Sequence, residues 1–241
     1  RILEPQPNMN NFLNKLYFRT KNQSYISSKH LELSENASVK KVVSIINNIY
    51  EKSEIRYVCV CIRKIINKET IDDIDLATNL KPDEVCSALK SNNINYYESG
   101  IEHGTITAVI DNKKFEITSL RKDILTDGRH AKVEFSLDWK EDASRRDFTI
   151  NAIYADREGN IFDPFNGKKD LEDGVISFIG DAENRIKEDY LRILRYIRFY
   201  LSYSKKTHDL KIIKIIRRNL QGVVNLSSER LLDEFKKLTT L

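Results

Sequence analysis

Hydrophobic residues in the first half of the chain follow both helical and strand-like spacing. Between residues 34 and 50, apolar side chains recur every three or four positions behind Ser and Asn capping candidates, which predicts a helix. Pro82 opens a second predicted helix that runs to about residue 91. Predicted strands cover residues 56–62, 73–77, 95–99, 104–111 and 114–120, and Asp111-Asn112 predicts a hairpin turn. This half therefore predicts a mixed α/β fold.

The pattern changes near residue 142, after which helical spacing dominates. Helices are predicted at residues 182–202 and 208–219, and Ser228 is predicted to cap a last helix. Turn-forming residues interrupt the pattern at 163–167, and a polar stretch at 121–131 predicts a loop. Residues 1–33 are polar and have no sustained period. We therefore predict three parts, which are an extension at 1–33, an α/β unit at 34–155 and an all-helical unit at 156–241.

Composition narrows the class of protein without selecting a function. The chain is 32% charged and 40% hydrophobic and has no apolar run approaching eighteen residues, which excludes disordered, collagen-like and membrane-spanning proteins. The net charge of +4 is too small to predict nucleic-acid binding without a local basic site. Three cysteines, an odd number, predict a reducing compartment such as the cytoplasm. Neither Cys59 and Cys61 nor the scattered histidines have the spacing of a zinc site.

Two carboxylates lie two positions apart on a predicted strand. Asp73 and Asp75 should therefore point to the same face, where their repulsion favours a bound cation. A pair of magnesium ions that clamps a phosphoryl transfer needs such an arrangement. Glu116 alternates with buried residues on another predicted strand and is a third candidate carboxylate. A solvated strand face for the pair, and an exposed Glu116, are the alternatives.

Clusters of arginine make up the second group of candidate residues. Arg145 and Arg146 precede an apolar segment, and guanidinium forks of this kind suit a triphosphate. Further along, one acid and three arginines would form a stripe on one helix. That stripe consists of Asp189, Arg192, Arg195 and Arg198. Because the only local acids are Asp189 and Glu188, an external anion is the simplest partner for the arginines. A solvated basic surface is the alternative for both clusters.

Taken together, six motifs in order resemble the class II tRNA CCA-adding nucleotidyltransferases and their bacterial poly(A) polymerase relatives. The resemblance spans residues 55–235, and the His-Gly-Thr motif favours the CCA-adding branch. The motifs are Asp73-Ile74-Asp75-Leu76-Ala77-Thr78, His103-Gly104-Thr105, Glu116-Ile117-Thr118, Arg145-Arg146-Asp147 with Asn151-Ala152, Asp163-Pro164-Phe165 with Gly167, and Glu188-Asp189 with Arg192.

The resemblance implies a polymerase-β-like α/β head with a mixed sheet, followed by an all-helical neck. It implies an enzyme that adds nucleotides from CTP and ATP to tRNA 3′ ends by two-metal phosphoryl transfer, with no membrane partner. By this resemblance, Asp73 and Asp75 would bind Mg²⁺, with Glu116 as a third catalytic carboxylate. Arg63 and Arg146 would contact the triphosphate. Asp189 and Arg192 would form a protein template for the base, and Arg195 and Arg198 would complete the nucleotide site. Residues 121–131 would be the mobile segment linked to the switch from C to A.

The sequence departs from the family pattern at several places. Cys59-Val60 replaces a Gly-Gly pair and Lys64 replaces an Asp, while Ser177 stands at a position that is usually basic. A β-branched Val60 is expected to obstruct a phosphate and to disfavour positive φ. Relatives continue past the neck into a body and tail, whereas this sequence stops at Leu241. The alternatives are a truncated, catalytically impaired nucleotide- or RNA-binding remnant, half of a split enzyme completed by a separate chain, and A addition of the poly(A) polymerase type.

Overall fold

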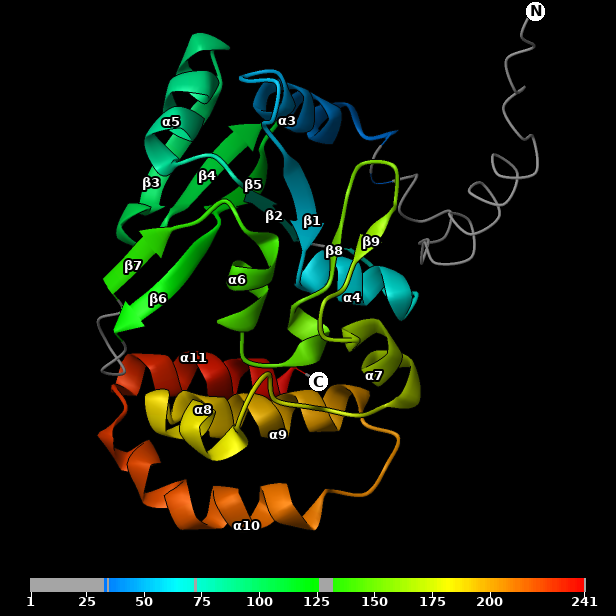
Figure 1. Ribbon diagram of the computed structural model, residues 1–241, viewed down its shortest axis with the longest axis vertical. Coiled ribbons are helices and arrows are strands. Elements are labelled where there is room, and N and C mark those ends of the chain that lie inside the picture. The colour runs from blue at the N-terminus through cyan, green and yellow to red at the C-terminus, as the bar shows by residue number, and fades with distance from the viewer. Residues whose placement is uncertain (1–32, 34, 72, 126–131, 241) are drawn as a thin grey trace, which may run out of the picture.

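A seven-stranded mixed sheet forms the upper part of the molecule in Figure 1. The computed structural model describes residues 33, 35–71, 73–125 and 132–240, so the predicted extension lies almost entirely outside the described residues. Strand β2 runs parallel to β5, and the other neighbouring strands pair antiparallel. The order is β3 (Asn95–Gly100), β4 (Thr105–Ile110), β5 (Lys113–Ser119), β2 (Ile74–Thr78), β1 (Ile55–Val58), β8 (Tyr154–Ala155) and β9 (Ile161–Phe162). The predicted mixed α/β fold is confirmed.

Three helices pack against this sheet and complete its core. They are α3 (Ala37–Asn47), α4 (Val60–Ile66) and α5 (Pro82–Ser91). The Asn36 side chain caps α3 by accepting from two backbone N–H groups of its first turn. Fully buried side chains from helices and strands, including Ile46, Leu89 and Phe115, form one cluster. Among the described residues, no helix is both long and apolar enough to cross a membrane.

Two segments of this region differ from the sequence prediction. The predicted strand 56–62 ends at Val58, because Cys59 has φ 57° and the chain turns there into α4. The predicted loop 121–131 contains strand β6 (Arg121–Leu125), which pairs with β7 (Lys132–Phe135) in a separate two-stranded sheet. Residues 126–131 lie outside the described residues. The predicted hairpin turn is confirmed, since Asp111 and Asn112 have φ values of 49° and 59°.

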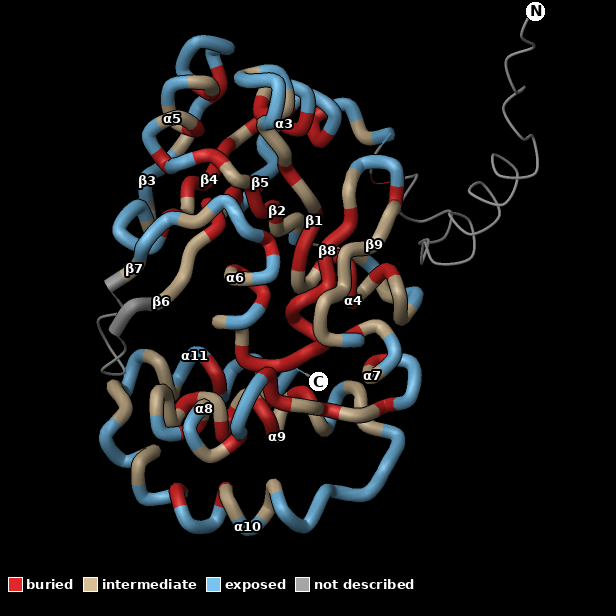
Figure 2. The backbone as a smooth tube through the Cα atoms, viewed as in Figure 1, coloured by how far each residue is buried: buried red, intermediate tan, exposed pale blue. Residues whose placement is uncertain are grey.

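After the short helix α6 (Trp139–Ser144), the chain returns to the sheet before it becomes helical. Strands β8 and β9 are only two residues long, which is too short for a periodic signal, and the prediction of helices from residue 142 missed them. The helical part consists of α7 (Gly167–Asp173), α8 (Ala182–Glu188), α9 (Leu191–Tyr203), α10 (Leu210–Asn219) and α11 (Ser228–Thr239). Helices α8 to α11 form the lower part of Figure 1, and the outer side of α10 is exposed in Figure 2.

The prediction of a single helix at 182–202 is wrong, because the helix is interrupted at Asp189. Asp189 has φ −156° and ψ 105°, which is extended backbone, and it separates α8 from α9. The predicted cap of the last helix is wrong by one position, because Ser228 is the first residue of the helix and Ser227 is its cap. A second buried cluster fills the space between these helices and the segment after α6, where the ring of Phe148 contacts those of Tyr196 and Phe199. This cluster fixes the helices against the sheet region.

Candidate active site

The turn from β1 into α4 places a strained residue at the centre of the site. Cys59 has φ 57° and ψ −113°, a conformation that favours glycine because it has no Cβ. Its thiol donates to the backbone oxygen of Asn151 at 3.2 Å and accepts from the guanidinium of Arg146. Val60 is the first residue of α4 and does not have positive φ. The conformational cost expected at Val60 therefore falls on Cys59.

The three predicted carboxylates lie on, or directly before, two neighbouring strands inside the sheet. Asp75 on β2 is the register partner of Glu116 on the parallel strand β5, while Asp73 lies one residue before β2. Burial raises the pKa of Asp75, and the charges of Glu116 and Asp73 raise it further, although a backbone hydrogen bond from Val60 acts in the opposite direction. None of these three acids forms an ion pair with another described residue. The charge of Arg146 opposes their repulsion at Asp75, but no direct ion pair with a described residue neutralises it.

This arrangement fits Mg²⁺ in one specific way. Within the described part of the chain, no three His, Cys, Asp or Glu side chains converge into a complete metal cage. Mg²⁺ in proteins is commonly held by only one or two carboxylates and takes its other ligands from water and substrate phosphates. Asp73 and Asp75 offer hard oxygen ligands of that kind, and a cation would relieve the repulsion that raises the pKa of Asp75. The residues therefore suit a metal that arrives with a phosphate.

A cavity of about 550 Å³ lies beside Asp75 and is walled by both the sheet region and the helices. Its lining holds nine cationic side chains against four carboxylates, so it favours a polyanion. Of the predicted site residues, Asp73 and Glu116 do not line it. The predicted residues that do are Arg63, Asp75, Arg146, Asp189, Arg192, Arg195 and Arg198. Arg145, a candidate anion-binding residue from its sequence, also lines it, and the charged or amide residues without a predicted role are Arg121, Asp123, Asp147, Asn151, Arg230 and Lys237.

Some of these additional residues carried a signal in the sequence and others did not. Arg145, Asp147 and Asn151 belong to a motif that the sequence analysis identified, so their place in the wall could have been anticipated. Arg121 and Asp123 lie on β6, in a stretch predicted as a loop. Helix α11 contributes Arg230 and Lys237, and nothing in its spacing indicates that Arg230 lies beside Asp189, 41 residues earlier in the chain.

Arg63 is a buried cation without a carboxylate partner among the described residues. Its side chain is only 4% exposed, and its guanidinium donates to the side-chain oxygen of Asn151. The guanidinium also lies over the rings of Phe199 and Tyr203, at 4.9 and 5.2 Å from their centroids. The Nε–H group is buried and has no acceptor within the described structure. Because a buried charge without a counterion is costly, Arg63 favours an anion in the cavity.

Protein carboxylates neutralise the predicted arginine stripe, contrary to expectation. Arg192 pairs with Glu188 at 2.7 Å and Arg195 pairs with Asp147 at 2.6 Å. Arg198 pairs with Glu234, a fully buried residue of α11. An external anion, expected as the simplest partner, is therefore not needed to neutralise these arginines. Two of the acids come from distant segments, which helical spacing alone cannot reveal.

Asp189 also has a protein partner. Its Oδ2 accepts from Arg230 at 2.8 Å and its Oδ1 accepts from the N–H of Leu191 at 3.1 Å. Asp189 and Arg192 lie at the junction of α8 and α9, where the extended backbone of Asp189 turns both side chains to the cavity. This junction therefore presents a carboxylate and a guanidinium side by side.

Buried Asp147 connects the two walls of the cavity. Burial raises the pKa of its carboxyl, but the charge and hydrogen bond of Arg195, with a further hydrogen bond from Asn151, lower it to about 2. Asn151 in turn accepts from Arg63. A continuous chain of polar contacts thus runs from α4 to α9 across the floor of the site.

Comparisons with known proteins agree with this geometry. Residues 55–177 match the family described as the poly A polymerase head domain. The human protein "CCA tRNA nucleotidyltransferase 1, mitochondrial" is 43% identical over 193 residues, which are 79% of this chain and 44% of that protein. The chain therefore spans about half the length of the curated relatives it matches.

Two solved structures extend the comparison to three dimensions. The crystal structure of the Bacillus stearothermophilus CCA-adding enzyme in complex with CTP has a TM-score of 0.72 at 29% identity, over 84% of this chain and 49% of that one. A tRNA nucleotidyltransferase complexed with a primer tRNA and an incoming ATP analog has a TM-score of 0.64 at 25% identity, over 81% and 55% of the two chains.

Proposed function

Because this chain belongs to the poly(A) polymerase head-domain family, we propose that it forms the head and neck of a tRNA nucleotidyltransferase that adds nucleotides from CTP and ATP to RNA 3′ ends. Residues 34–155 would form the head and 156–241 the neck, except that β9 at 161–162 belongs to the sheet of the head. The cavity is the observation that supports this most, because it joins Asp75, the buried cation Arg63 and the Asp189/Arg192 pair in one space. The CCA-adding relatives favour C and A addition over A addition alone.

The reaction would be an in-line transfer. The RNA 3′-hydroxyl attacks the α-phosphorus, the bond from the α-phosphorus to the bridging oxygen breaks, and pyrophosphate leaves. Mg²⁺ held by Asp73 and Asp75, with Glu116 beside them, would neutralise the charge that develops on the phosphoryl group. Arg63 and Arg146 would hold the triphosphate, and Arg195 and Arg198 would complete the cationic wall. The task of the protein is then mainly positioning and electrostatic stabilisation.

Base selection would depend on Asp189 and Arg192. Cytosine and adenine both present an exocyclic amine, which donates, next to a ring nitrogen, which accepts. A carboxylate accepts from the amine and a guanidinium donates to the ring nitrogen, so one pair of side chains suits both bases. Uracil and guanine present a carbonyl next to a ring N–H, which reverses both hydrogen bonds. Glu188 and Arg230, which bind Arg192 and Asp189, would hold the pair in its orientation.

The tRNA partner and any further RNA-binding part, including one on a separate chain, are parts of this proposal. The solved relative with a primer tRNA supports the RNA partner. A cytoplasmic location is also proposed, on the basis of the three cysteines in the sequence, which the structure describes as free thiols. The impaired remnant remains the competing function, and strained Cys59 at the phosphate-binding turn is the observation that favours it.

Equilibrium binding of nucleotides in MgCl₂ tests the proposal and separates it from the remnant. We expect CTP and ATP to bind at least about tenfold more tightly than UTP and GTP, since each reversed hydrogen bond costs about 1 kcal/mol or more. Arg192→Lys keeps the charge but removes the fork, and should abolish this preference while all four nucleotides still bind. Equal binding of the four nucleotides by the unmodified chain, or no binding, would support the remnant.

A further inference from the structure

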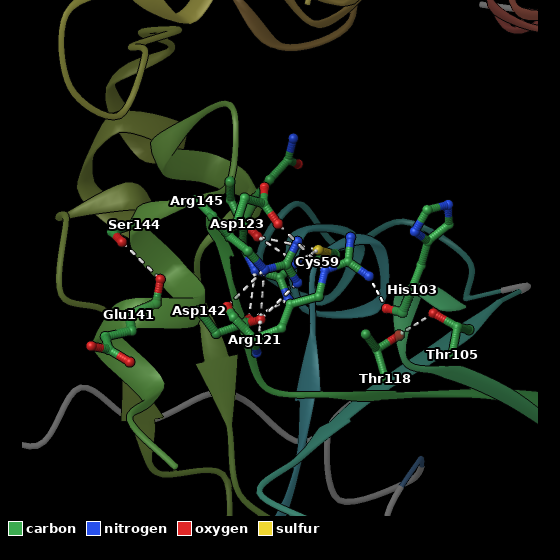
Figure 3. A network of polar contacts seen from close by, with 12 residues as sticks. Cys59, His103, Thr105, Thr118, Arg121, Asp123, Glu141, Asp142, Ser144 and Arg145 are labelled. Atoms are coloured by element: carbon green, nitrogen blue, oxygen red, sulfur yellow. Dashed lines mark hydrogen bonds and ion pairs between the residues drawn. The ribbon is translucent and has the colours of Figure 1, made fainter. Parts of the chain in front are cut away.

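One buried carboxylate holds two arginines of the cavity wall. Asp142 on α6 is 1% exposed, and both of its oxygens are fully used. Its Oδ1 accepts from Arg145 Nη2 at 2.6 Å and Nε at 2.9 Å. Its Oδ2 accepts from Arg146 Nη2 at 2.8 Å and Nε at 3.2 Å, and from the Tyr154 hydroxyl at 2.7 Å. Figure 3 shows Asp142 beside Arg145 and Arg121, with hydrogen bonds converging on its carboxylate.

The charges explain why this carboxylate matters. Burial raises the pKa of Asp142, but the charges of Arg146 and Arg145, with the hydroxyl of Tyr154, hold it well below its usual range. Two guanidiniums three and four residues along the chain would repel each other without this shared anion. The group as a whole keeps one positive charge, and both arginines line the cavity.

The same group also connects to the base of the β6–β7 hairpin. Arg145 Nε donates to the backbone oxygen of Arg121 at 3.1 Å, and the Arg121 N–H lies 3.4 Å from Asp142 Oδ1. From the helical side, Arg185 donates to the backbone oxygens of Arg145 and Arg146. The arginine pair is therefore fixed from the sheet region, the hairpin and the helices at once.

We propose that Asp142 is a positioning residue that orients Arg145 and Arg146 toward the triphosphate and ties them to the base of the β6–β7 hairpin. The inference rests on the proposed nucleotide site but concerns only its triphosphate half. Asp142 touches the arginines and not the Asp189/Arg192 pair. Asp142→Asn makes the group more positive by one charge, but we expect it to weaken phosphate binding through lost orientation of the two guanidiniums and to leave the preference between bases unchanged.

The test is the affinity for inorganic tripolyphosphate, CTP and UTP in MgCl₂, measured by calorimetry on Asp142→Asn. We expect tripolyphosphate, CTP and UTP to lose affinity by a similar factor of at least about ten, because small displacements of a positioned group cost this much or more. The ratio of CTP to UTP affinity should stay unchanged. Asp138→Asn is the matched control, because Asp138 caps the same helix through the Lys140 N–H and does not contact the two arginines.

The outcomes separate the two proposals. Unchanged tripolyphosphate binding in a folded Asp142→Asn variant would overturn the positioning role and leave the proposed function intact. Tight tripolyphosphate binding without base preference in the unmodified chain would count against the proposed function alone. If Asp142→Asn does not fold, Tyr154→Phe keeps the ring but removes the hydroxyl that donates to the same carboxylate and accepts from Arg146 Nε. It should then lower tripolyphosphate affinity a few-fold, and no change would overturn the proposal.

Discussion

Cys59 gives the sharpest quantitative test of how the turn from β1 into α4 is built. The residue has φ 57° and ψ −113°, a region that costs a residue with a Cβ about 1–3 kcal/mol. Replacing it by Gly relieves this strain, whereas replacing it by Ala does not. Both variants lose the same thiol contacts with Asn151 and Arg146, so those losses cancel when the two variants are compared.

The expected difference follows from two opposing terms. Gly normally destabilises a folded chain relative to Ala by about 0.5–1 kcal/mol, because its unfolded state has more conformational freedom. Subtracting this from the strain leaves about 0–2.5 kcal/mol in favour of Cys59→Gly. The usual order of Ala and Gly is therefore expected to be reversed at this position.

Urea denaturation monitored by circular dichroism measures the free energy of unfolding of both variants. We expect Cys59→Gly to unfold at a higher urea concentration than Cys59→Ala. An Ala variant as stable as the Gly variant, or more stable, would refute the assignment of strain to this turn. A Val60→Ala and Val60→Gly pair is the control, because Val60 begins α4 without positive φ and should show the usual order, with Ala more stable.

Three further predictions concern the acids and one glycine. The folded protein holds the proton of Asp75 more tightly than the unfolded chain, so the stability that this proton gives is lost as pH rises through the raised pKa. In EDTA, Asp75→Asn should therefore raise the thermal midpoint at neutral pH, and the gain should shrink toward pH 4. No gain at neutral pH would contradict this. A Cβ on Gly167 would lie 2.0 Å from the Thr149 backbone oxygen, so Gly167→Ala should lower the free energy of unfolding in urea by about 3 kcal/mol or more. Gly100→Ala is the control and should lower it much less, because the nearest atom to a Cβ there is at 3.4 Å. Arg195→Met leaves Asp147 buried without its cation and should lower the free energy of unfolding by about 3–5 kcal/mol. Adding Asp147→Asn in a double variant should restore part of this loss, and strictly additive losses would argue against the pair.

Local sequence signals predicted the elements that begin at a proline or in which apolar and polar residues clearly alternate. Helix α5 has the predicted bounds because Pro82 fixes its start, and the acidic strand β2 lies within one residue of its prediction. The sequence did not reveal the break at Cys59, because a Cys at positive φ carries no turn signal of its own. The break at Asp189 is hidden in the same way within a continuous helical pattern.

The sequence could not predict which residues of the candidate site pair with partners from distant parts of the chain. Motifs identified most residues of the cavity wall, but spacing along one helix could not show that Asp147 and Glu234 neutralise Arg195 and Arg198. These acids lie 48 and 36 residues away from their partners. The role of Asp142 was likewise not visible in the sequence, because a carboxylate four residues before an arginine is common on a solvated helix.

Ordered incorporation of nucleotides into RNA tests the central claim most directly. The substrate is a tRNA transcript that lacks its CCA end, supplied at high concentration with labelled CTP or ATP and MgCl₂. The account predicts addition of two C residues followed by one A, and loss of all addition in an Asp73→Asn/Asp75→Asn variant whose folding is verified by circular dichroism. ATP incorporation alone would move the chain to the poly(A)-type or A-adding branch. No incorporation by the folded, unmodified chain would contradict the proposal that this head and neck carry out the transfer.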